Sequence, residues 1–259
     1  MERLQSLRLI DDEFMTKCFE GEIACTELVL KIILEKNDLV VEDVKVQHFV
    51  KNLLKRSVRL DILATDKVGK KYNIEIQREG RGAGAKRARY HSSMIDANIL
   101  MPGEDFDSLE ETYVIFITER DVLGEGRPIY HVDRYIGESG NPFVDGAHIV
   151  DVNASYRGDT PLGHLMNDFY CTNPADMYYN VLAERVRYFK EEKEGATRVS
   201  KIFDEVREEG REEGREEGQM EQLVISVGQL MKNLQVDLAE ACRLLGTTQE
   251  KYEQAKALL

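Results

Sequence analysis

Residues 58–77 read VRLDILATDKVGKKYNIEIQ, the most informative segment of the chain. Apolar side chains occupy every second position over 58–64 and again over 72–76. Alternation with a period of two is typical of half-buried β-strands. The residues between the two runs, 66–70, include the Asp and Gly that favour a turn. The stretch is therefore predicted to form a two-stranded hairpin.

Two acidic side chains face each other in this hairpin. If the turn is centred on Val68, Asp61 pairs with Glu75, and opposed residues share one face of a sheet about 5 Å apart. Gln77 lies two residues further along that face. Facing carboxylates repel unless a positive charge lies between them, and Mg²⁺ prefers carboxylate oxygens. This predicts a divalent metal site, although a solvent-facing polar side of the hairpin would give the same pattern.

The composition excludes several classes of protein. The 259 residues are 42% hydrophobic and 32% charged, which suffices for one sizeable domain with an extension or for two domains. No apolar run approaches the length of a membrane span, and the first residues lack the apolar core of a secretory signal. The four cysteines are widely spaced, so we expect a cytoplasmic protein without a membrane partner. The five histidines show no ligand spacing, and we expect structural or surface roles for them.

The charge is distributed unevenly along the chain. The net charge is −13, yet residues 51–91 contain 12 Lys and Arg against four Asp and Glu. A solvated basic face is one interpretation of this segment. The other is a positive rim around the acidic pair, which would attract a polyanion such as a nucleic acid.

The rest of the first 195 residues alternates between the two kinds of element. Residues 112–118 (TYVIFIT) form a continuous aromatic and β-branched run, which is typical of a buried strand. Apolar periodicity and the position of Pro102 indicate the helices. We predict helices over 12–36 and 84–101 and within 162–194, and strands over 44–50, 112–118, 129–135 and 148–152.

The sequence changes character after residue 196. Residues 207–218 are three identical copies of Arg-Glu-Glu-Gly, in which Glu and Arg three residues apart can form ion pairs on a helix. A glycine at every fourth position weakens such a helix. The repeats are therefore either an exposed, partly helical linker or a dimerisation stalk. Beyond them, capping-box patterns at 237–240 and 247–250 predict short helices over 238–245 and 248–258.

A second motif competes with the acidic pair. Residues 80–85 match G-x-G-x-x-A between a predicted strand and a predicted helix, as in dinucleotide-binding turns. The preceding strand carries polar residues, whereas the first strand of such a domain is buried on both faces. We therefore interpret the glycines as a hinge before the basic start of the helix.

The ordered series of motifs resembles a known family. The segments are FMTKCFEGEIACTELVLKIIL, RSVRLDILATDKVGKKYNIEIQ, GAGAKRARYHSSMIDANIL, ETYVIFITERDVLGEGRPIYHVDR and the MYYNVLAERVRYFK region. Together they resemble the recombination-promoting nuclease/transposase family of the PD-(D/E)XK nuclease superfamily, over about three quarters of the chain. The resemblance implies an α/β, restriction-endonuclease-like mixed sheet flanked by helices over residues 1–195. A charged REEG linker over 196–222 and a small helical segment over 223–259 would follow.

The resemblance also implies a function. The superfamily's acidic residues correspond to Asp61 and Glu75, as ligands of Mg²⁺ or Mn²⁺, and Gln77 stands where lysine is usual. Glu27, on the first long helix, is our candidate for a further acidic catalytic residue. The expected activity is metal-dependent hydrolysis of DNA, and the expected phosphate-binding residues are Arg78, Lys86, Arg87 and Arg89. The C-terminal helices would form a homodimer or higher oligomer. The alternative is a weak or inactive nuclease fold that acts as an assembly module.

Overall fold

The computed structural model describes residues 2–52, 57–78 and 84–258, without the side chains of 2–3, 200, 202–210, 212–214, 216–217 and 257–258. The chain divides into two compact units, Met1–Val199 and Ser200–Leu259. The G-x-G part of the 80–85 motif lies outside the described residues.

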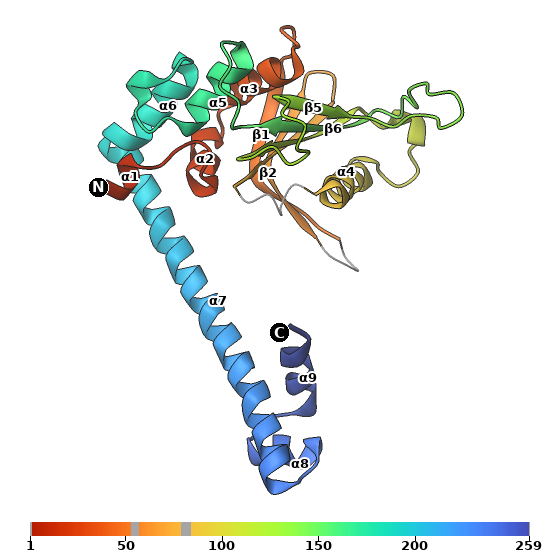
Figure 1. Ribbon diagram of the computed structural model, residues 1–259, viewed down its shortest axis with the longest axis vertical. Coiled ribbons are helices and arrows are strands. Elements are labelled where there is room, and N and C mark those ends of the chain that lie inside the picture. Colours follow the sequence, from red (N-terminus) through yellow and green to blue (C-terminus); the bar gives the residue numbers. More distant parts are fainter. Residues whose placement is uncertain (1, 53–56, 79–83, 259) are drawn as a thin grey trace. The chain divides into compact units, whose positions relative to one another are not determined.

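A six-stranded mixed sheet forms the centre of the first unit (Figure 1). Its spatial order is β1-β2-β3-β4-β6-β5. Strands β3, β4 and β6 are mutually parallel, and β1, β2 and β5 join this set by antiparallel pairing. The predicted buried run is β4, and every residue in it is buried. The strand bounds are β1 Val41–Val50, β2 Val58–Asp66, β3 Lys71–Gln77, β4 Thr112–Thr118, β5 Ile129–Val132 and β6 Ala147–Asn153.

Helices cover both faces of this sheet (Figure 1). Helix α4 packs against β4 and its neighbours, and Val114 and Phe116 contribute to the core beneath it. On the opposite face, Lys36, after α3, contacts Tyr113. This is the expected α/β, restriction-endonuclease-like fold. The helix bounds in this unit are α1 Glu2–Gln5, α2 Asp12–Phe19, α3 Ile23–Leu34, α4 Ala85–Ile99, α5 Pro161–Tyr170 and α6 Asn180–Glu191, with short 3₁₀ turns η1 Phe106–Ser108 and η2 Pro174–Asp176.

The predicted helix over 12–36 is wrong as one element. The structure breaks it into α2 and α3 at Gly21, which has a φ of +71° that L-residues rarely adopt. The break lets α2 pack against α6, where Phe14 meets Phe189 edge to face at 6.3 Å between ring centroids. The strand expected over 129–135 is also shorter than predicted and ends at Val132.

A buried lysine ties the N-terminal segment to α6. Lys190 is 4% exposed, and its Nζ donates to the backbone oxygens of Gln5 (3.0 Å) and Leu7 (2.6 Å). Burial lowers the pKa of this ammonium. We expect Lys190→Met to destabilise the protein by about 2–4 kcal/mol, because it leaves buried carbonyls without a donor. Urea unfolding measures this, and Lys45→Met at an exposed position should change stability by less than about 0.5 kcal/mol.

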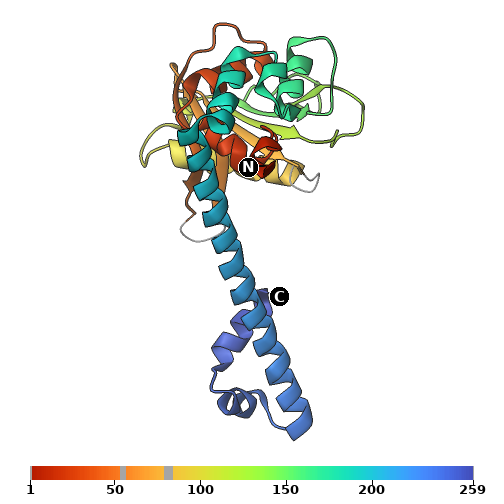
Figure 2. The same cartoon turned by 90° about the vertical axis from the view of Figure 1, so that its left-hand side faces the viewer.

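The second unit is helical (Figure 2). It contains most of α7 (Lys193–Leu234), followed by α8 (Leu238–Leu244) and α9 (Gln249–Leu258). Val227, Ala241 and Cys242 form its small core. Asp237 caps α8 as predicted, whereas the hydroxyl that caps α9 belongs to Thr248 instead of Thr247.

The REEG repeats lie inside α7, so their backbone is helical throughout. The acidic side chains of the expected ion pairs lie outside the residues whose side chains are described. Oligomerisation through this unit stays a prediction. Over the described ranges, no helix has the length and apolar character that crossing a bilayer requires.

Candidate active site

The predicted hairpin forms with the predicted register. Ile62 pairs with Ile74 and Leu63 with Asn73, as a turn centred on Val68 requires. Asp66 stabilises the turn by accepting the Val68 and Lys70 amides at 3.0 Å each. The alternation therefore predicted which residues face each other.

Regular pairing of β2 with β3 ends at Ile62. At the next residue, Asp61, the side chain takes the place of the backbone in bonding to β3. The Ile76 amide donates to Asp61 Oδ2 at 3.0 Å, and the Asp61 amide donates to Glu75 Oε1 at 3.3 Å. The two strands are thus held together by the acidic residues themselves. Asp61 and Glu75 lie side by side, as predicted.

Both carboxylates are buried, which contradicts the alternative of a solvent-facing polar side of the hairpin. Asp61 is 9% exposed and Glu75 is completely buried. Burial, followed by repulsion from Glu75 and Asp12, raises the pKa of Asp61 to about 8. The pair therefore has a strong tendency to take up a proton or another cation.

Helix α4 supplies the cation that accompanies Glu75. Arg87 Nη2 lies 3.1 Å from Glu75 Oε2, and His91 Nδ1 lies 3.4 Å from Glu75 Oε1. Arg87 Nε also donates to His91 Nε2 at 3.3 Å. Because arginine can only donate, Nε2 is the acceptor of this bond, and Nδ1 is the ring nitrogen that faces Glu75. Arg87 and His91 are one helical turn apart, so both reach the same carboxylate from one face of α4.

This arrangement changes two predictions. Arg87, expected to contact phosphate, is bound to Glu75. His91, expected to have an ordinary structural or surface role, is 4% exposed and contacts the acidic pair. The spacing of Arg87 and His91 is a signal for a shared helix face, but it does not reveal which carboxylate that face meets.

The structure does not bring Glu27 to the pair. Its carboxylate contacts Lys31 Nζ at 2.6 Å and accepts the Val41 amide at 3.0 Å. Val41 pairs with Asp66, five residues along β2 from Asp61, or about 16 Å at the rise of a strand. Glu27 thus supports the far end of the sheet.

Asp12, at the start of α2, is the acidic residue that sequence reasoning missed. Its charge raises the pKa of Asp61, although by less than burial and Glu75 do. The pKa of Asp12 is itself raised, by partial burial and then by Glu13 and Glu75. The break at Gly21 separates the α2 carboxylates from those of α3, and a single long helix gave no reason to choose Asp12.

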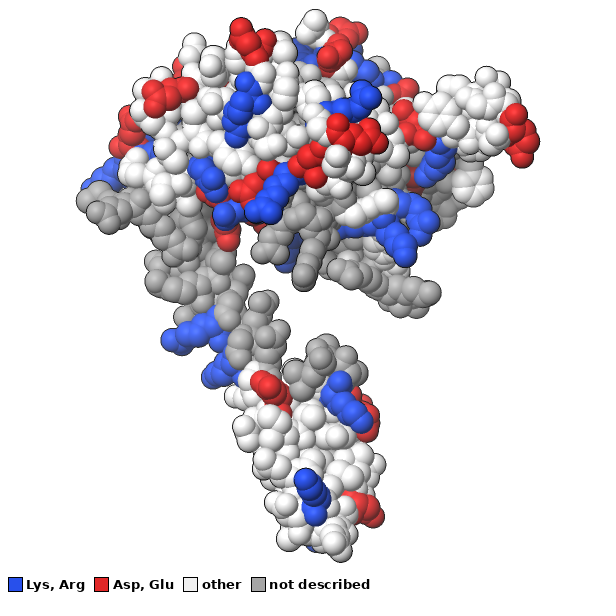
Figure 3. Space-filling model, in the orientation of Figure 1, with Lys and Arg blue, Asp and Glu red and all other residues white. Residues whose placement is uncertain are grey.

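The other predicted residues surround this centre. Gln77 follows Glu75 on the same face of β3 and is partly exposed. Arg78 forms an ion pair with Asp11 at 3.3 Å. Lys86 and Arg89 are exposed on the first turns of α4, where Figure 3 shows a cluster of basic side chains.

The donor set fits a hard divalent cation. Within the described ranges, no three His, Cys, Asp or Glu side chains converge closely enough to hold a metal ion by themselves. Mg²⁺ is commonly held by one or two carboxylates and keeps several of its waters. Asp61 and Glu75 supply such a pair. A bound cation would relieve the repulsion between their carboxylates.

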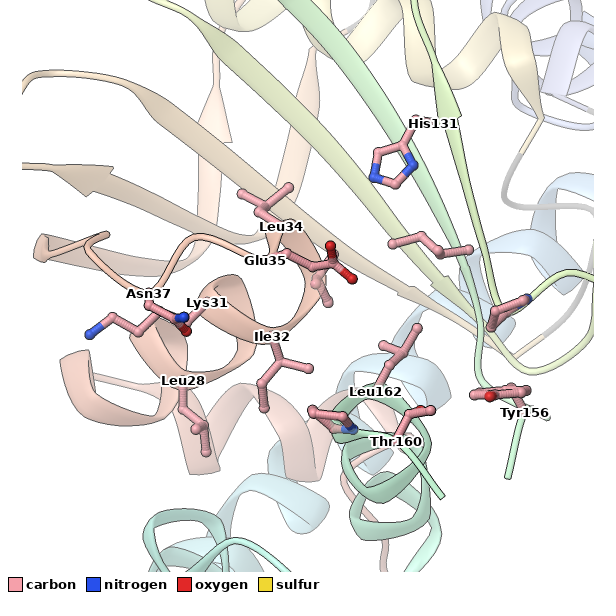
Figure 4. Close-up of a pocket in the computed structure, with 14 residues that line it drawn as sticks. Leu28, Lys31, Ile32, Leu34, Glu35, Asn37, His131, Tyr156, Thr160 and Leu162 are labelled. Carbon is pink, nitrogen blue, oxygen red and sulfur yellow. The ribbon is translucent and has the colours of Figure 1, made fainter. Parts of the chain in front are cut away.

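The first unit also contains a cavity away from the acidic pair (Figure 4). It has a volume of about 630 Å³ and is bordered by α3, β5 and the start of α5. Leu28, Ile32 and Leu162 are among its apolar lining residues, and none of the predicted site residues lines it. The chemistry of the acidic pair is therefore separate from this cavity.

Comparison with known proteins agrees with the geometry. The sequence model of the PD-(D/E)XK nuclease family transposase matches residues 26–152, which include Asp61, Glu75, Gln77 and the whole of α4. No curated protein and no solved structure matches the chain. Asp12 lies outside the matched segment, whereas the hairpin and its helical cover lie within it. Over residues 26–152, the chain is therefore similar to the PD-(D/E)XK nuclease family transposases.

Proposed function

We propose that this protein is a metal-dependent DNA endonuclease of the recombination-promoting type, which hydrolyses phosphodiester bonds at Asp61 and Glu75. The match to the family model supports a nuclease-type or transposase-like function. The observation that carries the finer proposal is the buried pair of carboxylates at the end of the hairpin, beside a basic helix. The four cysteines form no disulfide, which supports a place in the cytoplasm.

Asp61 and Glu75 would hold Mg²⁺ or Mn²⁺. When bound, the metal supplies Lewis acidity toward the scissile phosphate and lowers the pKa of water. Arg87 and His91 fix the orientation of the Glu75 carboxylate. The Ile76 amide fixes Asp61 in the same way.

Gln77 differs from the usual lysine in what it can do. Its partly exposed amide can donate to and accept from a water next to the acidic pair, so it can orient the attacking water. It cannot take up a proton near neutral pH. Lys86 and Arg89 can contact DNA phosphates, which gives affinity without sequence readout.

The test is cleavage of supercoiled plasmid by the purified protein with Mg²⁺, Mn²⁺ or EDTA. We expect nicking that requires metal and is lost in Glu75→Gln. Glu42→Gln, which alters an exposed residue of β1, is the matched control and should retain activity. If the folded protein cleaves under no condition, the proposal fails and the assembly-module alternative gains support.

Substitutions of Asp12 and Glu27 are expected to have different effects on cleavage in the same assay. We expect Asp12→Asn to lower cleavage about 10–100-fold, because its charge acts on both site carboxylates. Glu27→Gln should stay within about twofold, because Glu27 contacts Lys31 and the Val41 amide instead. The reverse order would return Glu27 to the catalytic site.

A further inference from the structure

A groove of about 290 Å³ lies between α4 and the β5–β6 edge of the sheet. Four of its lining residues come from α4, among them Lys86, Arg89 and Ser92, and Val132 and Ile149 come from the two strands. This volume has room for a group of the size of a nucleobase.

The groove lies on the same face of the sheet as the acidic pair. Ile149 pairs with Val114, and Val114 pairs with Asn73, which is two residues before Glu75 on β3. Helix α4 covers this face of the sheet. Consecutive residues of α4 contact the acidic pair and the groove, because Arg87 forms an ion pair with Glu75 and Lys86 lines the groove.

The rim of the groove carries more positive than negative charge: Lys86, Arg89 and Arg134 against Asp133, whose carboxylate lies 2.6 Å from His148 Nδ1. No ion pair of Lys86 or Arg89 occurs within the described part of the chain, whereas Arg134, also on the rim, is paired with Asp145. Positive side chains in the first turns of a helix oppose its dipole, and Gly84 offers α4 no side-chain cap. A bound anion would compensate both features.

The floor of the groove is apolar. Val132 is 42% exposed, and the partly buried Ile149 lies beside it in the neighbouring strand. A phosphate alone would use the rim and leave this floor in contact with water. A nucleotide uses both, because its base has apolar faces and its phosphate is anionic.

We propose that the groove binds one unpaired nucleotide of the DNA strand beside the cleavage site. The phosphate contacts Lys86 and Arg89, and the base packs on Val132 and Ile149. This rests on the proposed function, and it specifies the substrate as single-stranded or locally unpaired DNA. A duplex keeps its bases stacked inside, so only an extruded or unpaired base can reach such a floor.

Fluorescence anisotropy in EDTA tests the proposal without cleavage. The probes are a labelled oligothymidylate and a labelled duplex of the same length, and thymidine 5′-monophosphate and inorganic phosphate are the competitors. The full chain should bind the single strand more tightly than the duplex. Thymidine monophosphate should compete better than inorganic phosphate at the same concentration.

Three variants separate the floor from the rim. Val132→Asn is neutral and should weaken single-strand binding about fivefold, in the range of one lost base contact, while duplex binding stays within about twofold. Lys86→Gln with Arg89→Gln should weaken both substrates. Lys45→Gln on β1, at the opposite edge of the sheet, should weaken neither. Thermal unfolding checks that each variant is folded.

The outcome that overturns the groove is equal binding of both DNA forms together with no selective loss in Val132→Asn. Plasmid cleavage with Mg²⁺ is measured in parallel on the same proteins. Cleavage without selective binding rejects the groove and leaves the proposed function in place. Selective binding without cleavage supports the groove and rejects the endonuclease.

Discussion

Asp61→Asn is expected to abolish metal-dependent cleavage and, at the same time, to stabilise the metal-free protein. Loss of a ligand that supports several kcal/mol of transition-state stabilisation should lower the rate at least about 10³-fold. The amide retains an oxygen for the Ile76 N–H and can donate to Glu75, which removes a repulsion between buried carboxylates. A merely structural carboxylate would not produce both effects.

The stabilisation should depend on pH with a defined sign. The pKa of Asp61 is raised to about 8, by burial and then by Glu75, from an ordinary value near 4. A raised carboxyl pKa makes the protein most stable below about pH 4, and that advantage is lost as the pH rises to 8. The gain from Asp61→Asn should therefore be close to zero at pH 4 and reach on the order of 3–5 kcal/mol at pH 8.

Urea unfolding across this pH range, with and without Mg²⁺, measures the effect. Mg²⁺ should stabilise the wild type, because only the native state presents the pair, and it should have little effect on Asp61→Asn. Asp43→Asn, at an exposed position on β1, is the matched control and should show no gain that grows with pH. A variant that cleaves at the wild-type rate, or that is less stable than the wild type at pH 8, would contradict the assignment.

The hairpin shows how far local pattern reaches. Alternation and a short turn determine the register up to the pair of Ile62 and Ile74, so placing Asp61 beside Glu75 requires no knowledge of the rest of the fold. The same holds for β4, whose apolar run identifies it as a central strand. Burial of the polar positions on β3 is a different matter. Asn73 and Glu75 are fully buried because α4 packs over them, and nothing in the local pattern of β3 reports that contact.

The third acidic residue shows where helical periodicity fails. A single helix over 12–36 makes Glu27 the natural choice, because the break at Gly21 is not visible as a change of period. Once α2 is a separate helix, Asp12 lies in its first turn, and its charge acts on Asp61 and Glu75. In the REEG repeats, the structure is helical although the local sequence disfavours a helix. Glycine disfavours a helix at every fourth residue, yet the continuous helix α7 contains them.

Arg87→Gln is expected to destabilise the metal-free protein by about 2–4 kcal/mol. Glu75 is completely buried, and the guanidinium of Arg87 forms an ion pair with it at 3.1 Å. Removing one partner of a buried pair leaves the other charge uncompensated. The Arg87 side chain is 40% exposed, so water partly solvates the pair. The expected loss of stability is therefore smaller than for a fully buried ion pair.

The control lies on the same helix. Arg89→Gln removes an exposed cation from α4 and should change stability by less than about 0.5 kcal/mol. Arg87→Lys keeps the charge without the planar fork and should fall between the two. Equal stability of Arg87→Gln and Arg89→Gln would show that Glu75 does not depend on Arg87.

Mg²⁺ should reduce the difference in the free energy of unfolding between Arg87→Gln and the wild type. In the metal-free protein, Arg87 supplies the positive charge at Glu75, and a cation bound between Asp61 and Glu75 supplies it instead when metal is present. Urea unfolding at saturating Mg²⁺ measures the reduction, and Ca²⁺ offers a second hard cation for comparison. A difference that Mg²⁺ leaves unchanged would mean that the metal does not use Glu75, and the site would then have to be built on other carboxylates.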